Sequence, residues 1–194
     1  MNARDNIRIA NCSGYYGDKL SAAKELIEGG PIDFLTGDYL AELTMGILYS
    51  QKLKRGEDMG YVGTFLKQYR DVAKTCQAKG IKIVVNAGGL NPKSMANELN
   101  KINEELSLEM NVAYIDGDDI VDDLSTLHGQ GEEFIHLDKH VPISSSGCEI
   151  ITANVYLGAW GIVKALDLGA DVVICPRVTD ASLVIGPLHP RFQN

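Results

Sequence analysis

The chain has 194 residues, of which 45% are hydrophobic and 23% charged, and its formal net charge is −8. This composition is typical of a soluble globular protein and excludes disordered and fibrous classes. The acidic balance, without a run of basic residues, argues against nucleic acid or an anionic membrane surface as the main partner. We therefore expect one compact domain over residues 1–194 that binds neither nucleic acid nor membrane.

The four cysteines, Cys12, Cys76, Cys148 and Cys175, are far apart, and none belongs to a C-x-x-C pair. This spacing predicts neither a disulfide framework nor a zinc ribbon. The apolar runs are short, as at residues 81–85, and cannot span a bilayer. We expect a reduced cytoplasmic protein.

Strand-like and helix-like segments alternate along the chain. Strands are predicted at residues 7–10, 32–36, 81–85, 112–115 and 172–175, with a further short one at 150–153. Helices are predicted at about 18–28, 38–48, 65–79, 92–106, 119–127 and 158–168. Asp38 is predicted to cap the second helix, and Pro92 suits the first turn of the fourth.

This alternation predicts an α/β fold. Crossover helices imply parallel strand pairing and right-handed connections. We expect a mostly parallel, doubly wound sheet flanked by helices in three layers, because a closed eight-stranded barrel needs a longer chain. Residues 134–143 alternate like the arm of a hairpin, which predicts a small hairpin-like insertion near residues 129–147.

The last predicted strand is wholly apolar and is followed at once by Arg177, Asp180 and Ser182. In a parallel sheet the loops after all strands meet at one edge, so polar groups there converge on a ligand site. Arg177 is suited to binding a carboxylate or phosphate with two hydrogen bonds. The alternative role, given equal weight, is a structural salt bridge to Asp180 or Asp171.

Two glycine-containing loops also lie at this edge. Ser13-Gly14 and Gly88-Gly89 are expected to leave backbone N–H groups open before a helix, which favours an anion. Neither loop is a dinucleotide or Walker motif, and simple turn formation is the alternative. The predicted substrate-binding residues are Ser13, Gly14, Asn86, Gly88, Gly89, Asn91, Asn154, Arg177, Asp180 and Ser182.

Five aspartates lie between Asp116 and Asp123. They repel one another unless they are solvated, paired or bound to a metal. One interpretation is a divalent ion, Mg²⁺ or Mn²⁺, on Asp116 and Asp118. The preferred alternative is that Asp118 or Asp119 caps the next helix. The candidates for acid–base catalysis at this edge of the sheet are Asp18, Asp38, Glu42, Asp118 and Asp119.

His136, Asp138 and His140 alternate, and on a strand all three would share a face. Such a set can bind a transition metal. The solvated face of an edge hairpin is the favoured alternative, because no third histidine or cysteine pair accompanies it.

Six motifs occur in the order found in one family. They are Ser13-Gly-Tyr-Tyr-Gly-Asp18, Thr36-Gly-Asp-Tyr-Leu-Ala-Glu42, Asn86-Ala-Gly-Gly-Leu-Asn-Pro92, Gly117-Asp-Asp119, Asn154-Val-Tyr-Leu-Gly158, and Gly169-Ala-Asp-Val-Val-Ile with Arg177-Val-Thr-Asp-Ala-Ser182. Together they resemble the acyclic terpene utilisation (AtuA-like) family, over residues 7–188. Pro176 stands where the family usually has glycine, and family members usually continue past Leu188.

The resemblance implies a role in the breakdown of citronellol and geraniol, alongside acyl-CoA carboxylases and enoyl-CoA hydratases. We expect a cytoplasmic lyase or hydratase that acts on an anionic small molecule, for example a CoA thioester. The alternative is a non-catalytic subunit or half-domain whose site another chain completes. The expected assembly is a homo-oligomer or a complex with such a chain.

Overall fold

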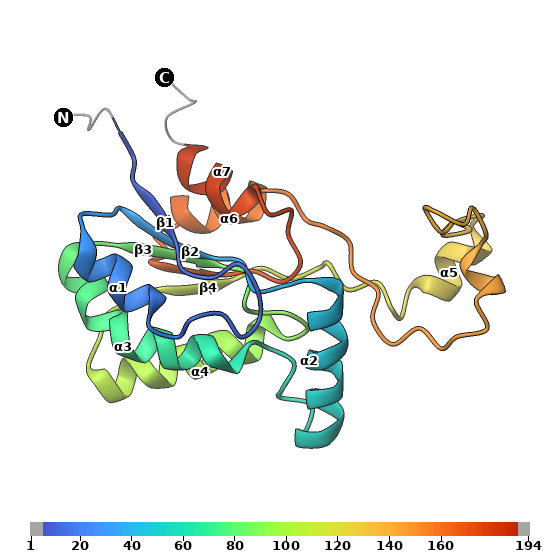
Figure 1. Ribbon diagram of the computed structural model, residues 1–194, viewed down its shortest axis with the longest axis horizontal. Coiled ribbons are helices and arrows are strands. Elements are labelled where there is room, and N and C mark those ends of the chain that lie inside the picture. Colours follow the sequence, from blue (N-terminus) through green and yellow to red (C-terminus); the bar gives the residue numbers. More distant parts are fainter. Residues whose placement is uncertain (1–5, 190–194) are drawn as a thin grey trace.

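The computed structural model describes residues 6–189 and contains one five-stranded parallel sheet with helices on both faces (Figure 1). The strands are β1 (Ile9–Asn11), β2 (Phe34–Gly37), β3 (Lys82–Val85), β4 (Val112–Tyr114) and β5 (Val172–Ile174). Their spatial order is β1-β2-β3-β5-β4, and every neighbouring pair is parallel. The predicted three-layer α/β class is confirmed.

The helices form two unequal layers. α1 (Ala22–Gly29), α3 (Gly63–Lys79) and α4 (Pro92–Leu106) cover one face of the sheet, and α6 (Trp160–Asp167) and α7 (Ser182–Leu188) cover the other (Figure 1). α2 (Glu42–Arg55) projects from the carboxyl edge. None of the helices within residues 6–189 combines the length and apolar character needed to cross a bilayer.

Alternation along the strands separates two hydrophobic cores. On β3, Ile83 and Val85 pack into the core beneath α1, α3 and α4, whereas Val84 packs into the smaller core beneath α6 and α7. The larger core includes Phe65 and Leu99, neither of which is measurably exposed. Each such buried side chain contributes about 1.5–3 kcal/mol to folding.

The order of the strands places a topological switch between β3 and β5. The chain steps from β1 to β2 to β3, skips one place to β4, and then turns back to β5. A right-handed crossover changes face when the chain reverses its direction across the sheet. The loop after β3 therefore leads to α4 on one face, and the loop after β5 leads to α7 on the other. Ligands of open α/β proteins bind where neighbouring loops diverge in this way.

Local predictions held at α4 and failed at α2. α4 begins at Pro92, and the Asn91 side chain accepts a hydrogen bond from Ser94 N. α2 begins at Glu42 with Ala41 as its N-cap, so the prediction that Asp38 caps it is wrong. The carboxylate of Asp38 instead accepts a hydrogen bond from Asn86, because the chain has not yet turned into the helix.

Residues 116–157 leave the sheet as a projecting segment, hereafter the arm, drawn in yellow and orange at the right of Figure 1. The arm contains α5 (Leu124–Gly129) and a 3₁₀ turn, η1 (Ile143–Ser145). The predicted hairpin is reduced to one antiparallel bridge between Ile135 and Pro142. The strand predicted at 150–153 does not form, and the arm returns beside its own start through a bridge between Asp119 and Asn154.

Candidate functional site

Arg177 is the central residue of the carboxyl edge. It follows the buried end of β5, and only 5% of its surface is exposed. Its backbone N–H donates to Oδ2 of Asp118 at 3.1 Å. Its side chain crosses to the loop after β2, where Nη1 donates to the carbonyl oxygen of Leu40 at 2.6 Å. The guanidinium is therefore held between the end of β5 and the start of α2.

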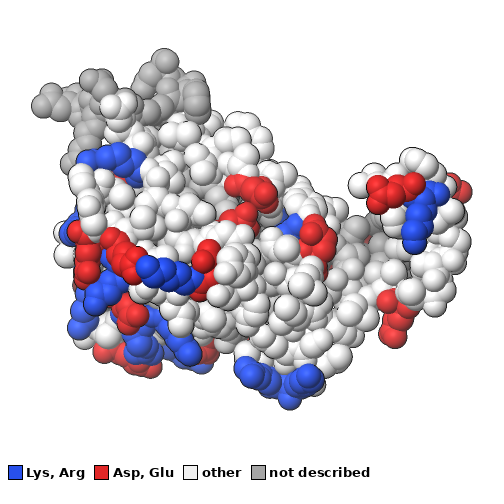
Figure 2. Space-filling model, in the orientation of Figure 1, with Lys and Arg blue, Asp and Glu red and all other residues white. Residues whose placement is uncertain are grey.

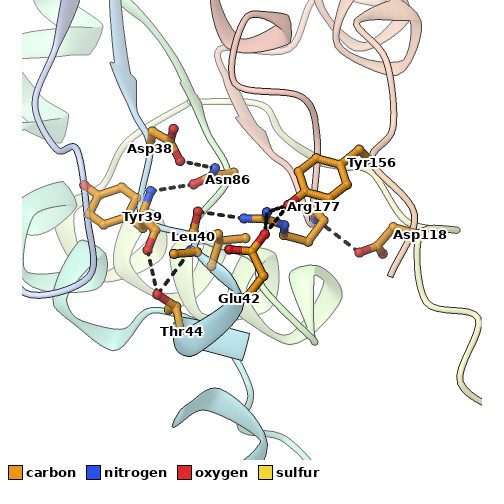
Figure 3. Close-up of polar contacts among 10 residues, drawn as sticks. Asp38, Tyr39, Leu40, Glu42, Thr44, Asn86, Asp118, Tyr156 and Arg177 are labelled. Carbon is orange, nitrogen blue, oxygen red and sulfur yellow. Dashed lines mark hydrogen bonds and ion pairs between the residues drawn. The ribbon is translucent and has the colours of Figure 1, made fainter. Parts of the chain in front are cut away.

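Glu42 and Tyr156 complete a cluster around this guanidinium (Figure 3). Nη2 of Arg177 lies 3.0 Å from Oε1 of Glu42 and also donates to the hydroxyl of Tyr156. The Tyr156 hydroxyl donates to the same Oε1. Cζ of Arg177 lies 4.3 Å from the centroid of the Tyr156 ring, which adds a cation–π contact.

The cluster sets the protonation of its members. The hydrogen bond from Tyr156, then a backbone hydrogen bond at Glu42 and, as a smaller effect, the charge of Arg177 lower the pKa of Glu42. Glu42 in turn raises the pKa of Tyr156, and Arg177 acts in the opposite direction. Near neutral pH the cluster thus holds a carboxylate, a protonated phenol and a guanidinium. The Glu42 side chain is 83% exposed and that of Arg177 only 6%, so the carboxylate lies on the solvent side of a buried cation.

A cleft of 260 Å³ opens on this cluster. It is lined by Glu42, Met45, Thr152, Asn154, Tyr156 and Arg177. A larger hollow of 560 Å³ lies elsewhere, against residues 28–33 and Lys79, and contains none of the predicted site residues. We take the smaller cleft as the candidate site, because it presents a buried cation at the carboxyl edge of a parallel sheet.

Asp118 supports the cleft from behind. It is 4% exposed, and its Oδ2 accepts hydrogen bonds from Arg177 N and from Asn154 Nδ2 at 2.9 Å. Burial raises the pKa of Asp118, while the two hydrogen bonds act to lower it. The two ends of the arm lie side by side at residues 118–120 and 153–156, hereafter its root. One carboxylate oxygen of Asp118 thus connects this root to the end of β5.

Asn86 plays a similar part between two other loops. It is buried, and its Oδ1 accepts from Tyr39 N at 2.7 Å while its Nδ2 donates to Oδ1 of Asp38 at 2.6 Å. Both predicted site residues, Asn86 and Asp38, therefore fix the loop that carries Leu40 and leads to Glu42.

The backbone groups predicted to be open for an anion are already bonded. Gly14 N donates to Asp18 Oδ2 at 3.0 Å, and Gly88 N donates to Cys175 O at 3.0 Å. Gly89 N donates within its own turn. The expectation that these N–H groups are open is wrong, because long-range and local hydrogen bonds satisfy them, in agreement with the alternative of simple turn formation.

The pair of glycines in the loop after β3 has a packing role instead. A Cβ on Gly88 would lie 2.7 Å from the carbonyl oxygen of Cys175. Gly89 has a φ of +54°, and a Cβ there would lie 2.3 Å from Leu48 Cδ1. Glycine is required here because the loops after β3 and β5 and the α2 helix approach closely.

The other predicted polar residues are held in local structure. Asn91 caps α4, Ser13 donates to Tyr15 O, and the hydroxyl of Ser182 bonds that of Thr179. Asp180 is exposed in the turn that precedes α7. The alternative of a salt bridge from Arg177 to Asp180 or Asp171 is wrong, since Arg177 pairs with Glu42 and Asp171 pairs with Lys82.

Neither Asp118 nor Asp119 caps the next helix, whose N-cap residue is Asp123, without a side-chain capping bond. α5 begins at Leu124, and Asp119 accepts instead from Val121 N in a turn. Asp116 is exposed, whereas Asp118 is buried in the contacts described above. Among residues 6–189, no three His, Cys, Asp or Glu side chains gather in a way that could hold a metal ion.

The histidine pattern of the arm also differs from the prediction. Residues 137–139 form a turn, and Nδ1 of His136 accepts the backbone N–H groups of Asp138 and Lys139. The interpretation of His136, Asp138 and His140 as one face of a strand is therefore wrong.

Tyr156 is a site residue that the sequence prediction missed. The sequence does contain a signal for it, because Thr152, Asn154 and Tyr156 alternate along an extended segment and all three line the cleft. An extended segment places every second side chain on one face. Asn154 was predicted, whereas Thr152 and Tyr156, two residues away on either side, were not, although the same alternation places them on its face.

Comparison with known proteins supplies one match. A family model described as "Acyclic terpene utilisation family protein AtuA" matches residues 7–193. No curated protein and no solved structure matches the chain. The matched range includes the sheet, the arm and all six residues that line the cleft.

Proposed function

This chain belongs to the acyclic terpene utilisation family AtuA, and from that premise we propose that it is a cytoplasmic enzyme of acyclic terpenoid and branched-chain acyl-CoA breakdown. We propose a reaction of the lyase or hydratase type on a small anionic molecule. The family description supports the catabolic context, and the cleft around Arg177 supports the anionic substrate.

The observation that carries the proposal is a buried guanidinium that already holds a carboxylate. Glu42 reaches Arg177 from the solvent side, with both of its contacts made by Oε1. A substrate carboxylate can accept the same charge-assisted hydrogen bonds as that oxygen, and a thioester carbonyl can accept the same two hydrogen bonds without the charge. We propose that the substrate enters the cleft, bonds to Nη2 of Arg177 and to Tyr156, and displaces Glu42 from the pair.

Adding or removing water beside a carbonyl requires a proton to move to or from carbon while negative charge develops on oxygen. Glu42 is the ionised, exposed carboxylate of the cleft, so we assign it the role of base. Arg177 would stabilise the charge on the carbonyl oxygen, and the Tyr156 hydroxyl would donate to it. The use of Mg²⁺ or Mn²⁺ stays a prediction from the sequence.

Binding tests the anion site. The probes are 3-methylbut-2-enoate and its CoA thioester, titrated calorimetrically into the wild-type chain and into Arg177→Gln. Loss of a charge-assisted pair should weaken binding by about tenfold or more. The matched control is Arg70→Gln, which removes a guanidinium from another pair, Arg70–Glu105 at 2.6 Å, on the α3 and α4 side of the molecule. Equal affinity of wild type and Arg177→Gln for both probes would show that Arg177 does not bind the anion.

Glu42→Gln separates binding from turnover. If Glu42 competes with the substrate for Arg177 and then acts as base, this variant should bind the probes at least as tightly as wild type. Its turnover should fall by about 10² to 10⁴. A variant that keeps wild-type turnover would exclude Glu42 as the base.

A second candidate function is favoured by the size of the cleft. Its 260 Å³ lies just below the range of about 300–1,000 Å³ usual for small-molecule sites. The alternative is a subunit or half-domain whose site another polypeptide completes. In that case the isolated chain binds neither probe, and activity appears only after the second polypeptide is added.

A further inference from the structure

The arm is the part of the molecule that the proposed function leaves unexplained. Its root is held by backbone bonds, Ile120 N to Ala153 O and Val155 N to Asp118 O. From residue 119 to residue 157, which includes all of the root except Asp118, no side chain is buried. Fixing each backbone residue costs about 1–2 kcal/mol, and the arm buries no core of its own to offset that cost. The arm therefore needs a surface to pack against.

The tip of the arm exposes apolar side chains. Leu137 is 88% exposed, and Ile135 and Val141, on the two sides of the turn, are 45% and 41% exposed. An exposed group of this kind on a projecting segment is typical of a protein contact.

The arm also carries the acidic charge of the protein. Residues 116–153 contain nine Asp and Glu and one basic residue, Lys139, which gives a formal charge of −8. The rest of the chain contains 17 acidic and 17 basic residues and is neutral. The net charge of the whole chain, −8, therefore resides in this segment, and the surface that receives it should be basic.

The far end of α2 is a surface of matching character. Its last turn carries Lys52, which pairs with Glu57 at 2.8 Å, and the exposed residues Lys54 and Arg55. Leu53 among them is 68% exposed. Figure 2 shows a group of basic side chains at the far end of this helix and acidic side chains around the arm. α2 and the arm project from the body in different directions, so the arm does not cover the α2 end of its own chain (Figure 1).

We propose that the acidic arm of one chain docks on the basic end of α2 of a second copy, with the apolar tip around Leu137 against Leu53. Each copy offers one arm and one α2 end, and the proposed assembly is the two-fold dimer in which both arms dock reciprocally, which leaves no arm or helix end unpaired. Asn154 and Tyr156 at the root of the arm line the cleft, so the same contact fixes one wall of the candidate site.

Sedimentation velocity with two charge reversals tests this interface. The wild-type chain should sediment as a dimer at low salt and dissociate as salt screens the contact. Lys52→Glu/Lys54→Glu/Arg55→Glu should be monomeric, because an acidic arm then meets an acidic helix end. Glu132→Lys/Glu133→Lys/Asp138→Lys should be monomeric for the opposite reason. The matched control, Lys67→Glu/Lys74→Glu/Lys93→Glu, reverses three exposed basic residues of α3 and α4 and should remain dimeric.

Mixing the two monomeric variants is the decisive step. Each arm in the mixture then meets a helix end of opposite charge, so a heterodimer should form, which also shows that neither variant is unfolded. The proposal is overturned if the wild-type chain is monomeric at low salt, if either reversal leaves the dimer intact, or if the mixture stays monomeric. Because this readout is independent of ligand, its failure is distinct from failure of the carboxylate site.

Discussion

The body and the arm of this protein are stabilised in opposite ways. The body has two cores built on alternating strand residues such as Ile83 and Val84, and its charges balance. The arm has no buried side chain between residues 119 and 157 and carries the net charge. The cleft lies where these two regions meet. Glu42 and Met45 on its wall belong to the body, and Asn154 and Tyr156 belong to the root of the arm. Arg177 contacts both regions.

The largest difference is expected for leucine truncations in the two regions. Leu99→Ala in the larger core should lower the free energy of unfolding by about 3–5 kcal/mol, because it leaves a cavity in a close-packed site. Leu137→Ala at the tip of the arm should change it by less than about 0.5 kcal/mol, because that side chain is exposed. Urea unfolding of the monomeric, arm-reversed chain measures both values, and equal losses would contradict the distinction.

An intermediate effect is expected where the two regions are joined. Asp118→Ala should lower the free energy of unfolding by about 2–3 kcal/mol, because Arg177 N–H and the Asn154 amide lose a buried acceptor. Asp118→Asn should cost less, since a single oxygen accepts both bonds and the amide oxygen can take its place. Unfolding of both variants tests this, and identical costs would show that the acceptor is unimportant.

The pH dependence of Asp118 has a definite sign. Burial raises the pKa of Asp118 above its ordinary value of 3.8, so the folded state binds its proton more tightly than the unfolded state does. This contribution to stability is fully present below pH 3.8 and is lost as pH rises through the folded value. As pH rises from 3.8 through the pKa of Asp118 in the folded state, the wild-type chain should therefore lose stability relative to Asp118→Asn. An opposite slope in the difference between the two unfolding profiles would contradict the assignment.

The smallest effect is expected at the surface end of the cluster. Glu42→Gln should change the free energy of unfolding by no more than about 1 kcal/mol, because the Glu42 side chain is mostly exposed and its pairing is weakened by water. Thermal unfolding in low and high salt measures this change. A loss of several kcal/mol would make the Arg177–Glu42 pair a structural bond of the body rather than a displaceable one.

Local pattern was enough to predict the body. Apolar runs and helix stripes predicted the parallel α/β sheet, Pro92 marked the start of α4, and the apolar β5 strand pointed to Arg177. These features depend on neighbours in the sequence and on rules of handedness.

The contacts between distant loops were beyond local pattern. Glu42 reaches Arg177 across 135 residues, and Gly88 N bonds Cys175 O, so neither the partner of the arginine nor the satisfied N–H could be inferred from spacing. The alternation at 134–143 suggested a strand, but with a single bridge and no neighbouring sheet it forms only a turn. Alternation of apolar and polar residues predicts a strand only where one face of the segment packs against a core, and the arm has no core.

The most direct measurement of the central claim is an NMR titration of arginine side chains in ¹⁵N-labelled chain with 3-methylbut-2-enoate. If the ligand carboxylate displaces Glu42, the guanidinium signals of Arg177 should shift and saturate, and those of Arg70 should not move. The same titration of Glu42→Gln should saturate at equal or lower ligand concentration. Arg177 signals that stay fixed in both proteins while the ligand binds would show that the cleft does not hold the anion.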